Sequence, residues 1–286
     1  MKYGVIDIGS NSVRLMMSDG LKTLYKNVKT TRLAEGMGED LLLKDEPIER
    51  TARAVSFFVE KARQENADEI FVFATAAVRR AKNKQQFIDL VKSLCNADVD
   101  VVSGEDEARL GVIGALNGSD GGVIDVGGAS AEICVVKDGT CVYTKSLYLG
   151  AVSVTDKCGQ NRNAVDKFVS EKVEEYGSVP KTEFYAVGGT ATSIAAVILE
   201  LEPYDPERVD GYTVTFDEME KLCSRLFSLS VSEREKLKGL QKERAKVIAS
   251  GVAIVLSIMK KLGVNKLTVS EKDNLEGYLK VMMGKK

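Results

Sequence analysis

Two short stretches of the chain repeat one pattern of aspartate, glycine and hydroxyl residues. "VIDIGSNSVRL" covers residues 5–15 and "VIDVGGASAEI" covers residues 123–133. In each, an apolar run reaches an aspartate, Asp7 or Asp125, and a loop of small residues follows. Successive backbone N–H groups in such a loop form a concave anion site, and an aspartate beside it can hold Mg²⁺. The pair therefore predicts two loops that grip a phosphate chain from both sides of a cleft.

The candidate phosphate-binding residues of these loops are small or carry short donors. Glycine lets a backbone N–H approach an anion closely, and serine and asparagine side chains add donors. The predicted phosphate-binding residues are Gly9, Ser10, Asn11 and Ser12 in the first loop and Gly127, Gly128, Ala129 and Ser130 in the second, with Asp7 and Asp125 as predicted magnesium ligands. A single glycine after a strand is usually only a turn, so the prediction depends on the two matched copies.

The composition narrows the chemistry that the chain can perform. It has no histidine, which excludes histidine-based triads and histidine-ligated metal sites. A general base must therefore be a carboxylate. Its five cysteines form no CxxC pair, which argues against zinc and suits a reducing compartment. With 40 Lys and Arg against 42 Asp and Glu, the net charge of −2 does not suit a general nucleic-acid binder.

Apolar periodicity predicts strands that alternate with helices, which is an α/β fold. Each aspartate loop follows a strand and precedes a hairpin, and the polar stretch "NGSDGG" at 117–122 separates the two copies. The apolar segment Val247–Met259 is shorter than the roughly 20 residues of a membrane span, so we expect a buried helix there. The chain starts directly on a strand-like segment without a signal-peptide pattern, so we expect a cytoplasmic protein with no membrane contact.

Several motifs, taken together and in order, carry a resemblance to a known family. They are "VIDIGSNSVRL", "ATAAVRRAKN" (74–83), "VSGEDEARLG" (102–111), "VIDVGGASAEI", "AVGGTATSIAAV" (186–197), "VDGYTVT" (209–215) and "VSEKDNLEGYL" (269–279). As a set they resemble the exopolyphosphatase and guanosine pentaphosphate phosphohydrolase family, within the actin-like ATPase fold. The resemblance implies two ribonuclease-H-like domains flanking a cleft, which we expect at 1–117 and 121–286. It also implies that the closing helix, 272–286, can pack on the first domain.

The resemblance implies roles for further residues. Glu107 falls at the position of the base that activates water, Glu132 at a second essential carboxylate, and Arg79 near the transferred phosphoryl group. Gly188, Gly189 and Thr190 fall in a third phosphate-binding turn. The residues alone leave plainer alternatives open: an acidic first helical turn around Glu107, a solvated arginine pair, and a simple strand-to-helix turn.

Three positions depart from the family pattern. Ala129 stands where a third glycine is usual, Ala131 replaces a usual threonine, and Asp210 stands where histidine is usual. An added Cβ at residue 129 could crowd a phosphate, and residue 131 loses a hydroxyl group. These departures are also compatible with a catalytically weak protein.

The expected activity is Mg²⁺-dependent hydrolysis that releases terminal phosphate from inorganic polyphosphate, from guanosine pentaphosphate, or from both. The sequence does not rank these two substrates. It does not fix the oligomeric state either, and a homodimer is compatible with it. Two alternatives remain at this stage. An actin-fold kinase would transfer the phosphoryl group to a hydroxyl acceptor, and a catalytically weak protein would bind the alarmone or polyphosphate without releasing phosphate.

Overall fold

The computed structural model describes residues 1–38 and 40–285 and contains two β-sheets with related topology. The first sheet has the order β3-β2-β1-β4-β5, with β1 (Tyr3–Ile8), β2 (Ser12–Ser18), β3 (Thr23–Thr30), β4 (Glu69–Ala74) and β5 (Asp100–Val101). The second has the order β10-β11-β9-β6-β7-β8, with β6 (Gly121–Val126), β7 (Ala131–Lys137), β8 (Thr140–Leu147), β9 (Phe184–Val187), β10 (Thr213–Thr215) and β11 (Lys266–Val269).

The two sheets share one plan of strand pairing around their central strands. β1 pairs antiparallel with β2 and parallel with β4, and β6 pairs antiparallel with β7 and parallel with β9. In each case the hairpin continues to a third antiparallel strand, β3 or β8. The α/β prediction is therefore confirmed, and the repeated motif marks the same hairpin in both halves.

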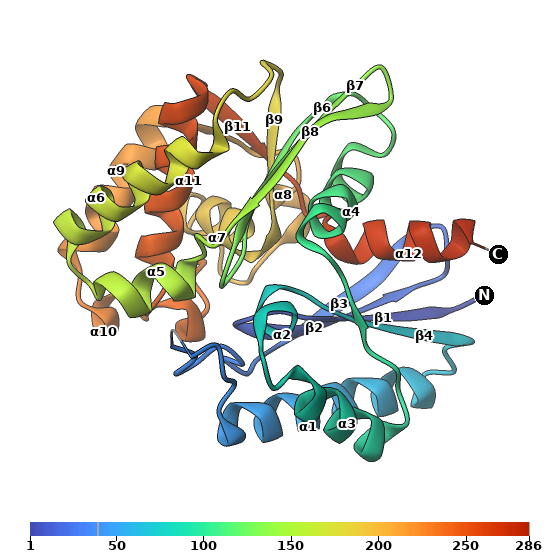
Figure 1. The fold of residues 1–286 in the computed structure, drawn as a ribbon. Coiled ribbons are helices and arrows are strands. Elements are labelled where there is room, and N and C mark those ends of the chain that lie inside the picture. The colour runs from blue at the N-terminus through green and yellow to red at the C-terminus, as the bar shows by residue number, and fades with distance from the viewer. Residues whose placement is uncertain (39, 286) are drawn as a thin grey trace.

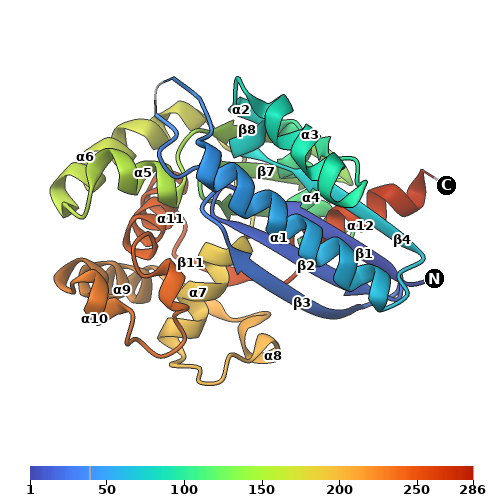
Figure 2. The same cartoon turned by 90° about the horizontal axis from the view of Figure 1, so that it is seen from below.

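Helices flank and separate the two sheets (Figure 1). On the first sheet, α1 (Asp45–Gln64) and α3 (Lys84–Cys95) cover one face, as Figure 2 shows from below, and α12 (Asn274–Gly284) covers the other. On the second sheet, α4 (Gly104–Leu116) covers the face turned toward α12. The far face of the second sheet carries α5 (Ala151–Cys158), α6 (Arg162–Val173), α7 (Gly188–Ile198), α9 (Phe216–Ser228) and α11 (Ile248–Leu262).

The central strand β1 is buried on both faces, which explains its nearly continuous apolar sequence. Ile6 and Ile8 belong to the core beneath α1 and α3. Tyr3 and Val5 belong to the core beneath α12. This packing anchors the strand end that carries Asp7.

The layer between the sheets consists of α4 and α12, which cross at close range. A Cβ on Gly114 would collide with the carbonyl oxygen of Asp273, and a Cβ on Gly277 would collide with that of Leu110. α4 thus packs on the second sheet and α12, the last helix, packs on β1 of the first. The exact domain limits 1–117 and 121–286 stay a prediction.

The remaining helices are short, and some were not expected. They are α2 (Ala76–Arg80), α8 (Pro206–Val209) and α10 (Val231–Arg234). The buried helix expected at Val247–Met259 corresponds to α11, and a 3-10 turn at Lys242–Arg244 precedes it. Within the described part of the chain, no helix is both long and apolar enough to cross a membrane.

Candidate active site

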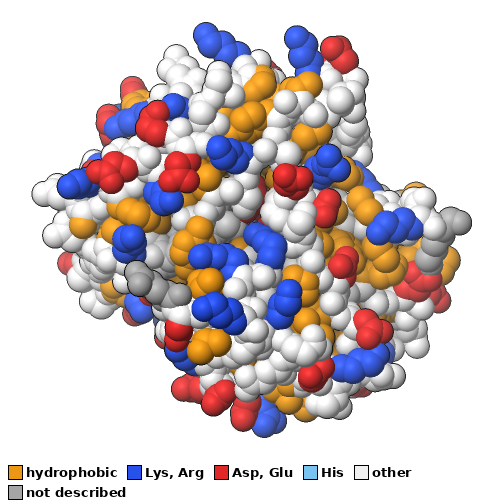
Figure 3. All heavy atoms as spheres, viewed as in Figure 1, with side chains coloured by type: hydrophobic (Ala, Val, Ile, Leu, Met, Phe, Trp, Pro, Cys, Tyr) orange, Lys and Arg blue, Asp and Glu red, His pale blue; other side chains and the backbone are white. Residues whose placement is uncertain are grey.

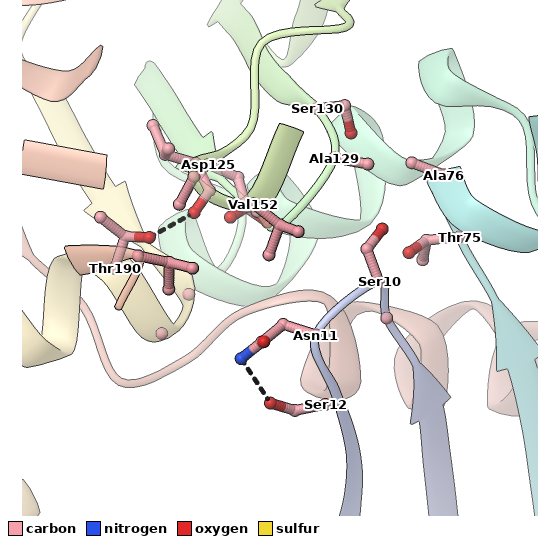
Figure 4. Close-up of a pocket in the computed structure, with 18 of the residues that line it drawn as sticks. Ser10, Asn11, Ser12, Thr75, Ala76, Asp125, Ala129, Ser130, Val152 and Thr190 are labelled. Carbon is pink, nitrogen blue, oxygen red and sulfur yellow. Dashed lines mark hydrogen bonds between the residues drawn. The ribbon is translucent and has the colours of Figure 1, made fainter. Parts of the chain in front are cut away.

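The two predicted phosphate loops adopt the same turn and face one another. The backbone N–H of Gly9 donates to the carbonyl of Ser12 at 3.0 Å, and that of Gly127 donates to the carbonyl of Ser130 at 2.9 Å. Figure 4 shows Ser10 and Ala129 on opposite sides of the pocket between these loops. Each turn lies directly after its central strand, so the shared strand plan of the two sheets produces the matched pair.

Close approach between the loops accounts for glycine at residue 128. A Cβ there would lie 3.0 Å from the Cβ of Ser10 and 3.2 Å from the backbone nitrogen of Asn11. Ala129 is 3% exposed and lines the pocket, and its φ is not among the positive values, so its backbone suits alanine. The departure at residue 129 therefore adds a methyl group to the pocket wall without straining the turn.

Most of the predicted site residues line this one pocket. Those that line it are Asp7, Gly9, Ser10, Asn11, Ser12, Glu107, Asp125, Gly127, Gly128, Ala129, Ser130, Gly188, Gly189 and Thr190. Arg79 and Glu132 are not among the lining residues. The pocket also takes lining residues that sequence analysis missed, chiefly Arg14, Thr75, Arg244 and Asn274.

Glu107 lies in the first turn of α4 and faces the pocket. It is 7% exposed, whereas Glu105 and Asp106 beside it are exposed. Its Oε2 accepts a hydrogen bond of 2.7 Å from Nη1 of Arg79, which also donates to the carbonyl of Val102. Burial raises the pKa of Glu107, and the nearby Arg79 charge opposes that rise. The structure thus places Arg79 on the carboxylate of Glu107.

Two further carboxylates, one half-buried and one buried, lie near Glu107. The pKa of Asp125 is raised to about 8, first by burial and then by the charges of Glu107 and Asp273. Glu132 is 2% exposed, and its Oε1 accepts a 2.6 Å hydrogen bond from Ser146. Burial and the charges of Glu107 and Asp125 raise the pKa of Glu132. The charge of Glu107 raises the pKa of both other carboxylates, so an added cation would be stabilised among them.

The first half of the repeat balances its aspartate with an arginine. In the register of β1 and β2, Asp7 lies directly opposite Arg14, just as Asp125 lies directly opposite Glu132 in the register of β6 and β7. Arg14 donates to Oδ2 of Asp7 at 2.6 and 3.0 Å and also forms an ion pair with Asp273. The charges of Arg14 and Lys26 hold the pKa of Asp273 low, at about 2, against the effect of its burial. Arg14 therefore bridges the first sheet and the segment that begins α12.

The two aspartates fit a hard cation such as Mg²⁺. Oδ1 of Asp7 is buried and has no hydrogen-bond partner among the described residues. Asp125 is a half-buried carboxylate without an ion pair in residues 1–38 and 40–285. In the same residues no group of three or more Asp, Glu, Cys or His could hold a metal by itself. Mg²⁺ commonly binds through one or two carboxylates plus phosphate oxygens, and this donor set suits that mode.

The third turn closes the pocket with a second arginine. Thr190 donates to the carbonyl of Val126 at 2.7 Å, which ties the start of α7 to the second loop (Figure 4). A Cβ on Gly189 would collide with the guanidinium of Arg244, so this glycine makes room for that side chain. Burial lowers the pKa of Arg244 to about 10, and no carboxylate pairs with it in the described part of the chain. It offers an unpaired cation to an anionic ligand.

The other two departures lie outside the pocket. Ala131 is fully buried with Ile133 and Val135 in the core of the second sheet, on the strand face opposite Glu132. Asp210 is exposed and accepts a 3.0 Å hydrogen bond from the backbone of Glu271. Neither residue takes a functional group away from the pocket.

Comparison with known proteins relates this chain to phosphatases. The profile of the Ppx/GppA phosphatase family matches residues 12–286. The bifunctional 3-dehydroquinate synthase/phosphatase of Fusobacterium nucleatum is 30% identical over 96% of this chain and 45% of its own length. The guanosine-5'-triphosphate,3'-diphosphate pyrophosphatase of Photobacterium profundum is 26% identical over 99% of this chain and 59% of its own length. The chain thus spans about half the length of these two relatives.

Two further comparisons cover nearly the full length of both chains. Exopolyphosphatase 2 of Mycobacterium tuberculosis is 27% identical over 99% of this chain and 99% of its own. The crystal structure of the Ppx/GppA family member of Aquifex aeolicus superposes with a TM-score of 0.82 at 28% identity, covering 100% of this chain and 98% of that one. The fold and the family resemblance inferred from the sequence are therefore confirmed.

Proposed function

The chain belongs to the Ppx/GppA phosphatase family, and on this premise we propose that it releases terminal phosphate from inorganic polyphosphate, guanosine pentaphosphate or both. The observation that carries the proposal is the single pocket where two matched phosphate loops meet a buried glutamate, Glu107. The names of the relatives from Photobacterium profundum and Mycobacterium tuberculosis support the same substrate classes.

The residues of the pocket divide the work of phosphoryl transfer, which needs positioning and charge neutralisation. The backbone N–H groups and hydroxyls of the twin loops hold the phosphates, and Arg244 neutralises part of their charge. Glu107 orients the attacking water and takes its proton. Arg79 fixes the Glu107 carboxylate through their 2.7 Å contact. Asp125 and Asp7 would hold Mg²⁺, which would supply further charge neutralisation at the phosphate.

A side-by-side assay of phosphate release tests this proposal. Long polyphosphate, short polyphosphate, guanosine pentaphosphate and ATP are compared with and without Mg²⁺. We expect Mg²⁺-dependent release from polyphosphate, guanosine pentaphosphate or both, and much less from ATP. ADP formation that requires a hydroxyl acceptor would identify a kinase instead. Tight binding with no release from any substrate would identify a binding protein.

A further inference from the structure

Two cysteines lie side by side beneath α4, outside the phosphate pocket. The Sγ atoms of Cys134 on β7 and Cys141 on β8 are 3.4 Å apart, which is within hydrogen-bond distance. All five cysteines are free, and no hydrogen bond joins any other two of them in the described part of the chain. A disulfide has a sulfur–sulfur bond of about 2.0 Å, so a small rotation of the two side chains would join this pair.

A β-bulge brings Cys141 to the face of the sheet where Cys134 lies. If the register of Cys134 continued unbroken along the hairpin, Cys141 would lie opposite Lys137, on the other face. The register shifts by one residue just before Val136, so Cys141 lies opposite Val136 instead. Because Val136 and Cys134 are two residues apart on β7, their side chains and that of Cys141 share one face. Bulges commonly re-aim a side chain in this way.

The two thiols differ in their exposure to solvent. Cys134 is 1% exposed and belongs to the apolar cluster that also holds Ala108 and Val112 of α4. Cys141 packs against the same cluster but is only half-buried. Figure 3 shows hydrophobic side chains reaching the surface around the β7–β8 hairpin, at the top of the view. An oxidant that arrives from solvent therefore meets Cys141 first.

The hydrogen bonds of the pair suit this order of reaction. Cys141 donates its S–H to the carbonyl of Tyr143 at 3.5 Å, which leaves Cys134 as the donor between the two sulfur atoms. Burial, and then this contact with Cys141, raise the pKa of Cys134 to about 12. Cys134 therefore keeps its proton at neutral pH, and it can give that proton up when its sulfur attacks an oxidised neighbour.

We propose that Cys134 and Cys141 form an oxidation site, which closes a reversible disulfide when a peroxide reaches it. The sulfur of Cys141 first bonds to one peroxide oxygen, the O–O bond breaks, and the thiol proton of Cys141 ends on the leaving oxygen. Cys141 is then a sulfenic acid. The sulfur of Cys134 attacks that of Cys141, the S–O bond breaks, and the leaving hydroxide takes the proton of Cys134. Two thiols are thereby oxidised to a disulfide, and hydrogen peroxide is reduced to two molecules of water.

The oxidation site adjoins the elements of the phosphate pocket without being part of it. Neither cysteine lines that pocket, so the inference does not rest on the proposed function. α4, which carries Glu107 in its first turn, packs on both β7 and β8. Closing the disulfide therefore repacks the sheet surface on which this helix rests.

Peptide mapping of the reduced, natively folded protein after treatment with hydrogen peroxide tests the inference. Oxidation precedes denaturation, because cysteines this close in sequence also meet in an unfolded chain. The remaining thiols are then alkylated in denaturant and the protein is digested with trypsin. Cleavage after Lys137 separates the two cysteines, so their disulfide appears as peptide 110–137 linked to peptide 138–145. We expect this linked pair as the dominant product, and dithiothreitol should remove it and restore all five free thiols.

Three variants separate the pair from the other thiols. Cys141→Ser removes the exposed partner and should leave Cys134 without any link. Cys134→Ala replaces a buried thiol by another small apolar side chain, so the sulfenic acid of Cys141 should persist and be trapped by dimedone. Cys158→Ser is the matched control, because Cys158 is also half-buried but has no thiol partner among the described residues. It should keep the linked pair, and thermal unfolding before oxidation checks that each variant is folded.

Two results would overturn the inference. In one, peroxide leaves both thiols of the native wild type free to be alkylated, or oxidises Cys141 without linking it to Cys134. The two cysteines would then be only small apolar residues of the core. In the other, links among the remaining cysteines are as abundant as the link between Cys134 and Cys141, which would show that the 3.4 Å contact gives no preference.

Discussion

Glu107 is set apart from its acidic neighbours by burial. Ser103 caps α4 by accepting the backbone N–H of Asp106 and donating to its carboxylate, and Glu105 is exposed. The plain interpretation of an acidic first turn therefore applies to Glu105 and Asp106. Glu107 is turned inward, where its carboxylate meets Arg79 and the phosphate pocket. Three adjacent acidic residues thus lie in two distinct environments.

Replacing Glu107 by glutamine should separate catalysis from binding. The change removes the base with little change in volume, and the phosphate loops stay in place. General-base assistance contributes about 10²–10⁴-fold, so the turnover number should fall by that factor while the affinity for substrate is kept. Steady-state phosphate release and calorimetric binding measure the two quantities.

Glu105→Gln is the matched control for this substitution. Its side chain is exposed on the same helical turn, so turnover should stay near the wild-type value. A larger defect in Glu105→Gln than in Glu107→Gln would show that the motif has been placed two residues out of register. Near wild-type turnover in Glu107→Gln would rule out Glu107 as the base.

The sequence predicted the residues of repeated loops and missed those contributed by distant segments. Arg14 was open to prediction, because it occupies the position in the first repeat that Glu132 occupies in the second. Arg244 and Asn274 carry no local signal. Arg244 reaches Gly189 from the turn before α11, and Asn274 donates to Asp125 at 3.2 Å from the start of α12. Only the tertiary fold brings these side chains to the cleft.

At the scale of elements, the crossing of α4 and α12 sets the geometry of the cleft. α4 carries Glu107, and the segment leading into α12 carries Asp273, which pairs with Arg14. Gly114 and Gly277 allow the two helices to approach within backbone contact. Because one helix packs on each sheet, a change in their separation would move Glu107 relative to Asp7.

Gly277→Ala should therefore reduce both stability and activity. Its Cβ would collide with the carbonyl oxygen of Leu110, and overpacking of this kind costs about 1–3 kcal/mol. Thermal unfolding and phosphate release measure the two effects. Gly284→Ala is the control on the same helix, because its Cβ would meet no atom within 4 Å. Since alanine favours helix, Gly284→Ala should leave the stability of the protein unchanged or raise it by up to about 1 kcal/mol. Equal stability of Gly277→Ala and Gly284→Ala would contradict the close crossing of α4 and α12.

Strands and amphipathic helices were predicted well because their periodicity is local. β1, β4, α1 and α3 follow clear apolar patterns, and each aspartate loop does precede a hairpin, β2–β3 in the first half and β7–β8 in the second. α5 and α6 were not predicted. Arg244, in the turn before α11, packs against Gly189, which is a contact between distant segments. Such contacts do not appear in a single sequence.

At the scale of the whole molecule, the fold buries carboxylates where its two halves meet. The pKa of Asp125 rises from its usual value near 3.8 to about 8, so the folded state holds this proton where the unfolded chain releases it. Between about pH 4 and pH 8 the folded state binds more protons than the unfolded state. The free energy of unfolding should therefore fall as pH rises through this window. A cation bound between the two halves of the molecule would offset this loss of stability.

Asp125→Asn should make the protein more stable and less active at the same time. The asparagine amide has no proton to release. Without divalent cations, the unfolding midpoint of the variant should therefore fall less than that of the wild type between about pH 5 and pH 8. At about pH 8 the unfolding midpoint of the variant should exceed that of the wild type. Added Mg²⁺ should stabilise the wild type more than the variant. Asp120→Asn is the control: Asp120 accepts backbone hydrogen bonds that lower its pKa, so this variant should keep the wild-type trend and activity. Parallel curves of unfolding midpoint against pH for Asp125→Asn and the wild type would show that the ionised Asp125 carboxylate does not destabilise the folded protein.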